Sequence, residues 1–347
     1  MVSAMADPQL PPPEILDEID AHMYKTAIFR AAIELQVWAK VAAGFNTADR
    51  MAAQEHWDPI GTRLLLDDLC GLRLLSREGT EYRLVPESEW YLLPDKPTYM
   101  GAYLQADFGW EGNGQLANAI RAGQRPIGYS ATSPETASTW IGIYAGSLGA
   151  PDAYLSRCDQ MWKEAGVEPR QGLWVLDVAC GPAPRSLALA RAHPGVRVTL
   201  IDWEGVLDNA IELASKLGVA AQLDCFAGDM WGTPFGSQRF DIVHLGSITH
   251  FLSPEENTRL FTKAYESLVE GGALVINAVR REYPSAMAPG LWFYATSKGG
   301  APYDFAEYSE MLREAGFEEI IDVAAQPIKA IKRLRSPASI GGGETTR

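Results

Sequence analysis

The chain has 347 residues, a formal net charge of −14, and 47% hydrophobic against 21% charged residues. This composition excludes wholesale disorder, and the length favours two domains because a single core usually stops growing at about 250–300 residues. The acidic balance argues against nucleic acid and membrane surfaces as partners, since both are anionic.

The cysteines and the N-terminus predict a cytoplasmic protein. Four cysteines are scattered without a Cys-x-x-Cys pair, which predicts neither a zinc site nor a disulfide framework, and no bound metal is expected. The Pro-rich, acidic N-terminus lacks the basic and apolar regions of a signal peptide. No stretch approaches the roughly 18 uninterrupted apolar residues of a membrane span.

The first part of the chain, residues 14–100, has helical patterns. Apolar residues at helical spacing predict helix over 15–42, with a break near His22, and a short helix over 48–54. A loose leader is expected before this part.

A capped helix and a hairpin follow. Asp58 can cap a helix over 60–70, with Pro59 in its first turn and Gly71 at its end. Two alternating runs around Glu78 and Gly79 then predict a hairpin. Three helices and a hairpin in this order predict a winged helix.

The winged helix raises the question of DNA binding. Its presumptive recognition helix carries Arg63 against Asp58, Asp67 and Asp68, whereas a helix that reads a DNA groove needs cationic and amide side chains outside. We therefore predict a dimerisation domain, with a winged-helix regulator as an alternative.

Residues 101–165 are rich in aromatic side chains and are predicted to form a helical connector that supplies pocket walls. Flat apolar walls suit a flat apolar substrate. Positions predicted to face the substrate are Trp110, Tyr144, Trp292 and Tyr294, the last two from the part that follows.

Residues 166–335 alternate apolar strands with helices, and a disordered tail is expected at 336–347. The predicted strands are 173–179, 196–202, 240–246 and 272–279, and the predicted helices include 185–192, 206–217 and 254–268. Nearly continuous apolar strands separated by helices predict an α/β fold with a parallel, doubly wound sheet. Such sheets bind ligands beyond the carboxyl ends of their strands.

A turn of small residues follows the first of these strands. Asp177, Ala179, Gly181 and Ala183 alternate there, and small residues let backbone N–H groups approach a ligand closely. Alone, this turn is also compatible with an ordinary strand-to-helix connection.

Two further acids make the pattern specific. Asp202 ends the second strand, where a carboxylate can accept both hydroxyls of a ribose. Gly228, Asp229 and Met230 precede the next strand, so that Asp229 could accept an adenine amino group while Met230 and Trp231 flank the ring. Together these features predict a nucleoside site.

Both parts, in this order, resemble the S-adenosylmethionine (SAM)-dependent O-methyltransferases of the plant and bacterial natural-product type. The resemblance spans about residues 20–335 and is carried by VLDVACG, VTLIDWEGVLDNA, AGDMW, ITHFLSPEENTRLF and EMLREAGF. It implies a Rossmann-like class I methyltransferase domain behind a winged-helix dimerisation domain, a homodimer, SAM as cofactor and a small-molecule acceptor.

The resemblance also implies roles for individual residues. The cofactor-binding positions are Asp177, Ala179, Cys180, Gly181, Asp202, Trp203, Gly228, Asp229, Met230, Trp231 and Ser247. His250 matches the histidine that deprotonates the acceptor hydroxyl in the family. Ser253 and Glu256 form a capping-box pattern that begins the next helix and leaves His250 in the loop above the sheet, and a histidine with a pKa near 6.5 can take a phenol proton there.

The chain departs from the family pattern at two places. Ala179 and Ala183 stand where glycines are usual, and Asn277 and Ala278 stand where members carry an acid that orients the histidine. The predicted reaction is methyl transfer to a hydroxyl of a small aromatic or polyketide-like acceptor. Alternatives are a C-methyltransferase, an enzyme that uses SAM for decarboxylation, hydroxylation or rearrangement, and a catalytically silent relative that binds a ligand.

Overall fold

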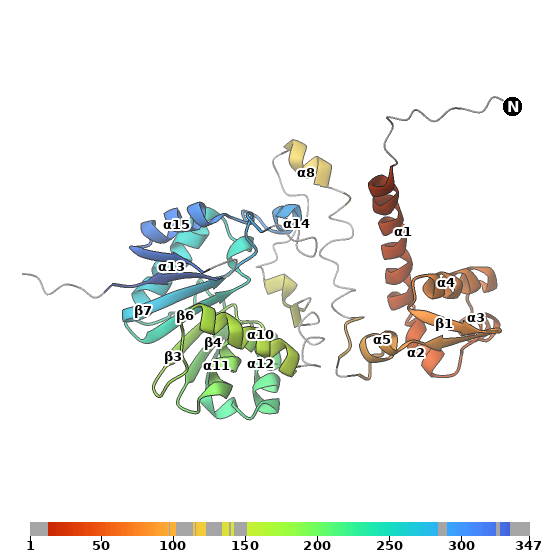
Figure 1. Cartoon of the computed structure of the whole chain (residues 1–347), viewed down its shortest axis with the longest axis horizontal. Coiled ribbons are helices and arrows are strands. Elements are labelled where there is room, and N and C mark those ends of the chain that lie inside the picture. The colour runs from red at the N-terminus through yellow and green to blue at the C-terminus, as the bar shows by residue number, and fades with distance from the viewer. Residues whose placement is uncertain are drawn as a thin grey trace, which may run out of the picture. The chain divides into compact units, whose positions relative to one another are not determined.

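The structure is a computed structural model that describes residues 13–96, 98–101, 114, 116–122, 134–138, 140–141, 151–283, 290–323 and 327–333. The chain divides into two compact units, residues 1–105 and 106–347 (Figure 1). The connector expected at 101–165 therefore groups mostly with the second unit. The predicted tail at 336–347 lies outside the described residues.

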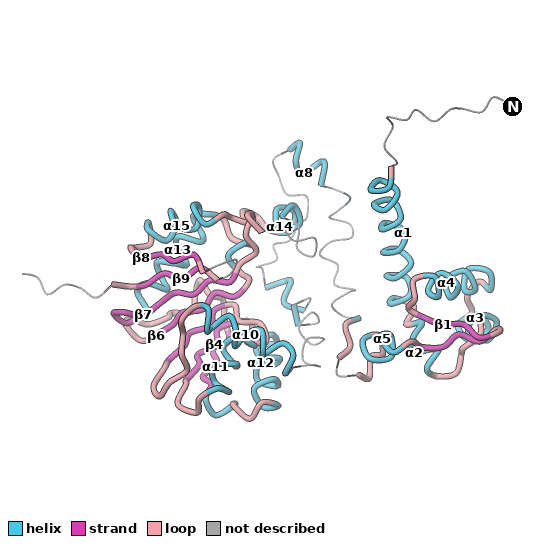
Figure 2. Tube along the Cα trace, viewed as in Figure 1, coloured by secondary structure: helices cyan, strands magenta, loops and turns pink. Residues whose placement is uncertain are grey.

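The first unit contains helices and one hairpin, as the sequence predicts (Figure 2). Its elements are α1 (Glu14–Glu34), α2 (Val37–Ala42), α3 (Ala48–Glu55), α4 (Pro59–Gly71), β1 (Leu75–Glu78), β2 (Glu81–Leu84) and α5 (Pro86–Tyr91). Asp58 caps α4 by accepting the Gly61 N–H at 2.6 Å, and Pro59 is the first helical residue. The antiparallel pair β1–β2 turns at Gly79, whose φ of 61° favours glycine. The order of elements is that of a winged helix, an assignment that stays a prediction.

One helix boundary predicted in this unit is wrong. The first long helix does not break near His22; it ends at Glu34, and the chain turns at Gln36, which has a φ of 54°. By contrast, α4 ends at Gly71 as predicted, although the left-handed residue that follows it is Arg73, with a φ of 62°. Neither Gln36 nor Arg73 is a residue type that marks a helix end.

The second unit is built around a seven-stranded sheet in the order β5-β4-β3-β6-β7-β9-β8. The strands are β3 (Trp174–Val178), β4 (Arg197–Asp202), β5 (Leu223–Ala227), β6 (Phe240–Gly246), β7 (Leu268–Asn277), β8 (Glu319–Asp322) and β9 (Ile328–Ile331). Strands β3 to β7 pair in parallel, whereas β9 pairs antiparallel with both β7 and β8. The four predicted strands are thus parallel, as expected, and the sheet is mixed only at the edge formed by β9 and β8, which sequence reasoning did not predict.

Helices cover both faces of the sheet (Figure 1). Helices α10 (Pro151–Glu164), α11 (Pro184–Ala192) and α12 (Glu204–Lys216) pack on one face, and α13 (Pro254–Ser267) and α15 (Phe305–Glu314) pack on the other. Alternation along β3 divides the core, since Leu176 and Val178 lie on the α13 face and Val175 on the α11 face. This is the doubly wound α/β fold that the sequence predicts.

The other elements that the structure describes in this unit are short. They are α8 (Leu116–Ala122), α14 (Gly290–Thr296) and the 3₁₀ turns η1 (Pro134–Thr136), η2 (Ala220–Gln222) and η3 (Thr249–Phe251). Within the described ranges no helix is long and apolar enough to cross a membrane. The cytoplasmic location expected from the sequence stays a prediction.

Candidate active site

The strand order reverses between β3 and β6, and a pocket opens at the carboxyl ends of the strands beside this switch. Its lining residues are Trp140, Ala179, Ile201, Asp202, Trp203, Val206, Gly228, Asp229, Met230, Gly246, Ser247, Ile248 and Phe251. The walls are thus mainly apolar, with two carboxylates among them.

Asp202, at the end of β4, is an acidic residue of the pocket whose carboxylate is held by two backbone N–H groups. Its Oδ2 accepts the Gly181 N–H at 2.8 Å, and its Oδ1 accepts the Trp203 N–H at 2.8 Å. Burial raises the pKa of this carboxyl to about 6, although both hydrogen bonds oppose the shift. Each oxygen of an ionised carboxylate has a second lone pair, so Asp202 can accept two further hydrogen bonds.

The turn after β3 requires left-handed backbone at non-glycine residues. Ala179 has a φ of 51° and Ala183, which precedes α11, has a φ of 52°, while Gly181 between them has a φ of 56°. This conformation explains why glycine is favoured here, because a Cβ strains left-handed backbone. The alanines are accommodated, and the turn still places the Gly181 N–H on Asp202.

The loop after β5 brings Asp229 and Met230 to the pocket and is held from α13. Asp229 Oδ1 accepts the Trp231 N–H at 2.8 Å. The ammonium group of Lys263 donates to the carbonyl oxygens of Met230 at 2.5 Å, Trp231 at 3.3 Å and Thr233 at 3.1 Å. It also lies 4.2 Å from the Phe235 ring centroid. Lys263 is a positioning residue that sequence reasoning missed, because nothing in its helical pattern indicates three carbonyl partners.

A buried polar row crosses the sheet behind the pocket. Asp177 on β3 pairs through Oδ1 with His244 Nδ1 on β6 at 2.9 Å, and through Oδ2 it accepts the Ser186 hydroxyl of α11 at 2.6 Å. His244 Nε2 lies 3.4 Å from Asn277 Oδ1 on β7. Asp177 and His244 are distant in sequence, and their pairing follows from their matched positions on the adjacent strands β3 and β6.

His250 lies in η3, immediately after β6, and is 2% exposed. Its Nδ1 accepts the backbone N–H of Val279, which follows β7, at 3.2 Å. The ring packs 4.2 Å from Phe293 of α14 and 4.8 Å from Phe251. Burial alone lowers the pKa of His250 to about 3, far from the value near 6.5 that the sequence argument assumed.

An aromatic cluster adjoins the pocket around Phe251, which lines it. Trp140, Trp292 and Phe293 pack on Phe251 with ring centroids 5.8, 5.8 and 5.3 Å away. Tyr294 instead directs its hydroxyl to the Ala119 carbonyl at 3.4 Å. Trp110 and Tyr144, also predicted to face the substrate, lie outside the described residues.

Comparison with known proteins adds to this geometry. Residues 175–272 match the model of a methyltransferase domain. The chain is 26% identical to the 3-hydroxy-5-methyl-1-naphthoate 3-O-methyltransferase of Streptomyces sahachiroi, over 89% of this chain and 90% of that protein. It is 27% identical to the tetracenomycin polyketide synthesis 8-O-methyl transferase of Streptomyces glaucescens, over 94% and 97%.

Residues 175–272 are thus a methyltransferase domain, and the chain is similar over most of its length to SAM-dependent O-methyltransferases. Human N-acetylserotonin methyltransferase, solved in complex with SAM, has the same fold, with a TM-score of 0.72 and 20% identity over 95% of this chain and 100% of that one. The similarity therefore extends over nearly the whole length of the methyltransferase and is not confined to the domain that binds the cofactor.

The methyltransferase pocket contains most, not all, of the residues predicted to bind SAM. Those that line it are Ala179, Asp202, Trp203, Gly228, Asp229, Met230 and Ser247. Four predicted residues do not line it: Asp177, Cys180, Gly181 and Trp231. The Gly181 N–H donates to Asp202, which does line the pocket. Both carboxylate oxygens of Asp177 are hydrogen-bonded elsewhere, to Ser186 and His244. Trp140, Ile201, Val206, Gly246, Ile248 and Phe251 were missed. Trp140 is distant in sequence, so only the folded chain reveals it.

Proposed function

We propose that this methyltransferase transfers the methyl group of SAM to a hydroxyl of a small aromatic or polyketide-like acceptor. The observation that carries the proposal is the pocket at the switch between β3 and β6, where Asp202 faces an otherwise largely apolar lining. Support for the acceptor class comes from the two relatives, which are named for a naphthoate and for a tetracenomycin polyketide.

The residues present fit SAM. Asp202 would accept the ribose hydroxyls, since each of its oxygens has a free lone pair beside one backbone N–H. Asp229 and Met230 would hold the adenine in the loop that Lys263 anchors. The backbone after β3, from Ala179 to Gly181, would hold the methionine part. When bound, SAM supplies an electrophilic methyl group on a sulfonium.

The protein's own contribution to the reaction is alignment and exclusion of water. Methyl transfer requires the attacking oxygen, the methyl carbon and the sulfur to lie in line, and a dry site strengthens the attraction between oxygen and sulfonium. Phe251, Trp140 and Phe293 supply apolar walls for a flat acceptor beside the pocket. His250, packed on two of these rings, would contact the acceptor oxygen, and its role as general base stays a prediction.

We also propose a homodimer formed through α1. Ile15, Ile19 and Met23 recur every fourth residue and therefore lie on one face of this helix. They are 72%, 62% and 55% exposed, and Leu16 beside them is 68% exposed. A continuous apolar face of this kind marks an interaction surface, and a second copy of the chain would bury it.

The acceptor proposal is tested by mass spectrometry of reactions with SAM and matched aromatic compounds. A hydroxynaphthoate should gain one methyl group, and the same naphthoate without the hydroxyl should gain none. Conversion of SAM to S-adenosylhomocysteine (SAH) should accompany the first reaction alone. Methylation of the compound without a hydroxyl would show that the enzyme is a C-methyltransferase. Absence of product with every acceptor would contradict the proposal.

A further inference from the structure

We propose that His250 donates a hydrogen bond from Nε2–H to the acceptor oxygen, and that the acceptor binds with its hydroxyl already ionised. The inference rests on the proposed function, whose acceptor oxygen it places at His250. It assigns to His250 the opposite direction of hydrogen bonding from that of a general base.

The backbone of Val279 sets this direction. An amide N–H can only donate, and it points at Nδ1 of His250 from 3.2 Å. A neutral imidazole carries one N–H and one lone pair, so a lone pair on Nδ1 places the proton on Nε2. The other tautomer would turn two N–H groups toward each other and leave both unpaired in a buried site.

The position that supplies this N–H is informative. Val279 lies two residues after the end of β7, and the residues before it, Asn277 and Ala278, carry no carboxylate. A carboxylate beside the ring would accept a hydrogen bond from Nδ1–H and leave the lone pair of Nε2 free to act as a base. The N–H of Val279 does the reverse, because it uses the Nδ1 lone pair and leaves the proton on Nε2.

The surroundings of His250 oppose the uptake of a proton. Its ring is enclosed by Phe251 and Phe293 and is 2% exposed, and no charged group in the described part of the chain offsets the cost of charging it. Burial accordingly lowers the pKa of the imidazole to about 3. Nε2 has no hydrogen-bond partner among the described residues. His250 does not itself line the pocket, but its neighbours Ile248 and Phe251 do, so an acceptor bound against them would reach the Nε2–H.

The turn that carries His250 is fixed on several sides. Asn257 Nδ2 donates to the carbonyl oxygens of Thr249 at 2.9 Å and Leu252 at 3.3 Å. The Thr249 hydroxyl lies 2.7 Å from the Tyr308 hydroxyl, and Tyr303 donates to the Leu252 carbonyl at 2.7 Å. These bonds hold the backbone of η3, so the orientation of the ring toward Val279 is part of the fold.

A hydrogen-bond donor at this position selects the acceptor by its acidity. The hydroxyl proton leaves to solvent before binding, and the resulting oxyanion accepts the Nε2–H bond. The oxygen then forms a bond to the methyl carbon as the carbon–sulfur bond breaks, the electron pair stays on sulfur, and both charges vanish. No proton passes to His250. The acceptors favoured are phenols acidified by a conjugated carbonyl, a quinone or an electron-withdrawing ring substituent.

Nuclear magnetic resonance of the protein tests the tautomer without any reaction. The chain has only five histidines, so labelling histidine with ¹⁵N gives few signals. The signals that disappear in the His250→Gln variant are assigned to His250. We expect Nε2 protonated and Nδ1 unprotonated across the neutral pH range, in the presence and absence of SAH. A proton on Nδ1, or a ring that titrates near neutral pH, would overturn the proposal whether or not an acceptor is known.

Kinetics test the direction of the hydrogen bond. His250→Gln keeps an N–H donor without a useful base, and His250→Phe keeps a ring without a donor. With a nitro-substituted naphthol, His250→Gln should stay within about tenfold of the wild-type kcat, and His250→Phe should lose a further tenfold to hundredfold. A general base predicts equal losses in the two variants.

The pH dependence separates the same alternatives with the wild-type protein. For a naphthol and its nitro-substituted analogue, the inflection of kcat/KM should move with the pKa of each acceptor hydroxyl. A single inflection common to both acceptors would assign proton removal to the protein and contradict the proposal. If neither naphthol is methylated, the proposed function fails, and the tautomer measurement still decides the state of His250.

Discussion

At the scale of single residues, the turn after β3 has an unusual backbone. Ala179 is left-handed, with a φ of 51°, a conformation that costs an L-residue about 1–2 kcal/mol and glycine almost nothing. Ala179→Gly should therefore raise the free energy of unfolding by about 0.5–1 kcal/mol, after allowance for the greater entropy of an unfolded glycine. Urea denaturation measures the change.

The control is the same substitution in ordinary helix. Ala53→Gly, at an exposed position inside α3, should lower the free energy of unfolding by about 0.5–1 kcal/mol. Equal losses in both variants would show that Ala179 carries no backbone strain.

Asp202 makes nucleoside binding depend on pH. Burial raises the pKa of its carboxyl to about 6, so the group is ionised above that pH and protonated below it. Only the ionised form accepts two hydrogen bonds from ribose, and SAH affinity should fall up to about tenfold from about pH 7 to about pH 5. Asp202→Asn should bind more weakly with a flat profile, and an unchanged slope in this variant would assign the titration to another group.

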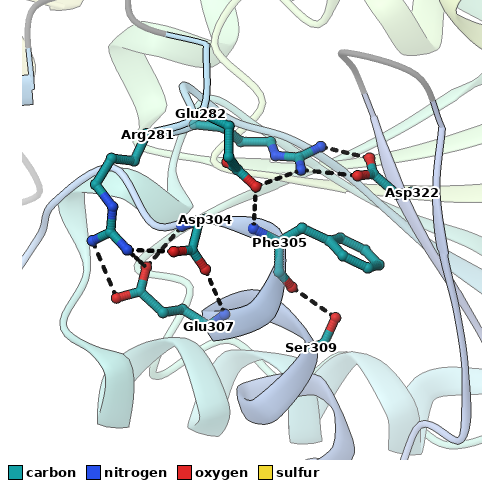
Figure 3. A network of polar contacts seen from close by, with 8 residues as sticks. Arg281, Glu282, Asp304, Phe305, Glu307, Ser309 and Asp322 are labelled. Atoms are coloured by element: carbon teal, nitrogen blue, oxygen red, sulfur yellow. Dashed lines mark hydrogen bonds and ion pairs between the residues drawn. The ribbon is translucent and has the colours of Figure 1, made fainter.

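At the scale of elements, a network of ion pairs joins the end of β7 to β8 and α15 (Figure 3). Arg280 is 3% exposed; its guanidinium donates to the two carboxylate oxygens of Asp322 at 2.7 and 3.1 Å and to Glu282 at 3.0 Å. Glu282 also accepts the N–H of Phe305 at the start of α15. Arg281 forms ion pairs with both Asp304 and Glu307.

Removing one partner of Arg280 should be costly. Asp322→Ala leaves a buried guanidinium that is already unsatisfied at Nε, so we expect a loss of about 2–3 kcal/mol in the free energy of unfolding. Glu318→Ala, which breaks the exposed pair with Arg333, should cost less than about 1 kcal/mol. Thermal or urea denaturation of both variants measures the two losses. Equal losses would contradict this prediction.

Local patterns predict the elements of this fold better than they predict its polar contacts. Strands β3, β4, β6 and β7 read as apolar runs, and Ser253 and Glu256 form the predicted capping box of α13. The turn at Gln36 has no such signal, because neither glycine nor proline stands there. The antiparallel strands β8 and β9 are too short to stand out.

The site shows the same limit. Asp202, Asp229 and Met230 follow strand ends and could be found by position, but the Asp177–His244 pair and the Val279 N–H on His250 depend on which strands become neighbours. Contacts between strands depend on the order of the strands in the sheet, which a single sequence does not specify directly. The tautomer of His250 therefore emerges from the structure alone.

At the scale of the whole molecule, the proposed dimer depends on the exposed apolar residues of α1. Ile15→Glu with Ile19→Glu should convert a dimer to a monomer in sedimentation experiments, because two buried charges would oppose association. Ile211→Glu on α12, at a residue 43% exposed, should leave the dimer intact. A monomeric wild-type protein would remove the proposal.

The central claim is that the pocket beside Asp202 binds the SAM nucleoside. Calorimetric titration with SAH at neutral pH tests it most directly, with Asp202→Ala as the matched variant. The account predicts one SAH per chain and a loss of at least about tenfold in affinity in Asp202→Ala, since two hydrogen bonds to a charged group disappear. No binding by the wild-type protein, or equal affinity in the variant, would contradict it.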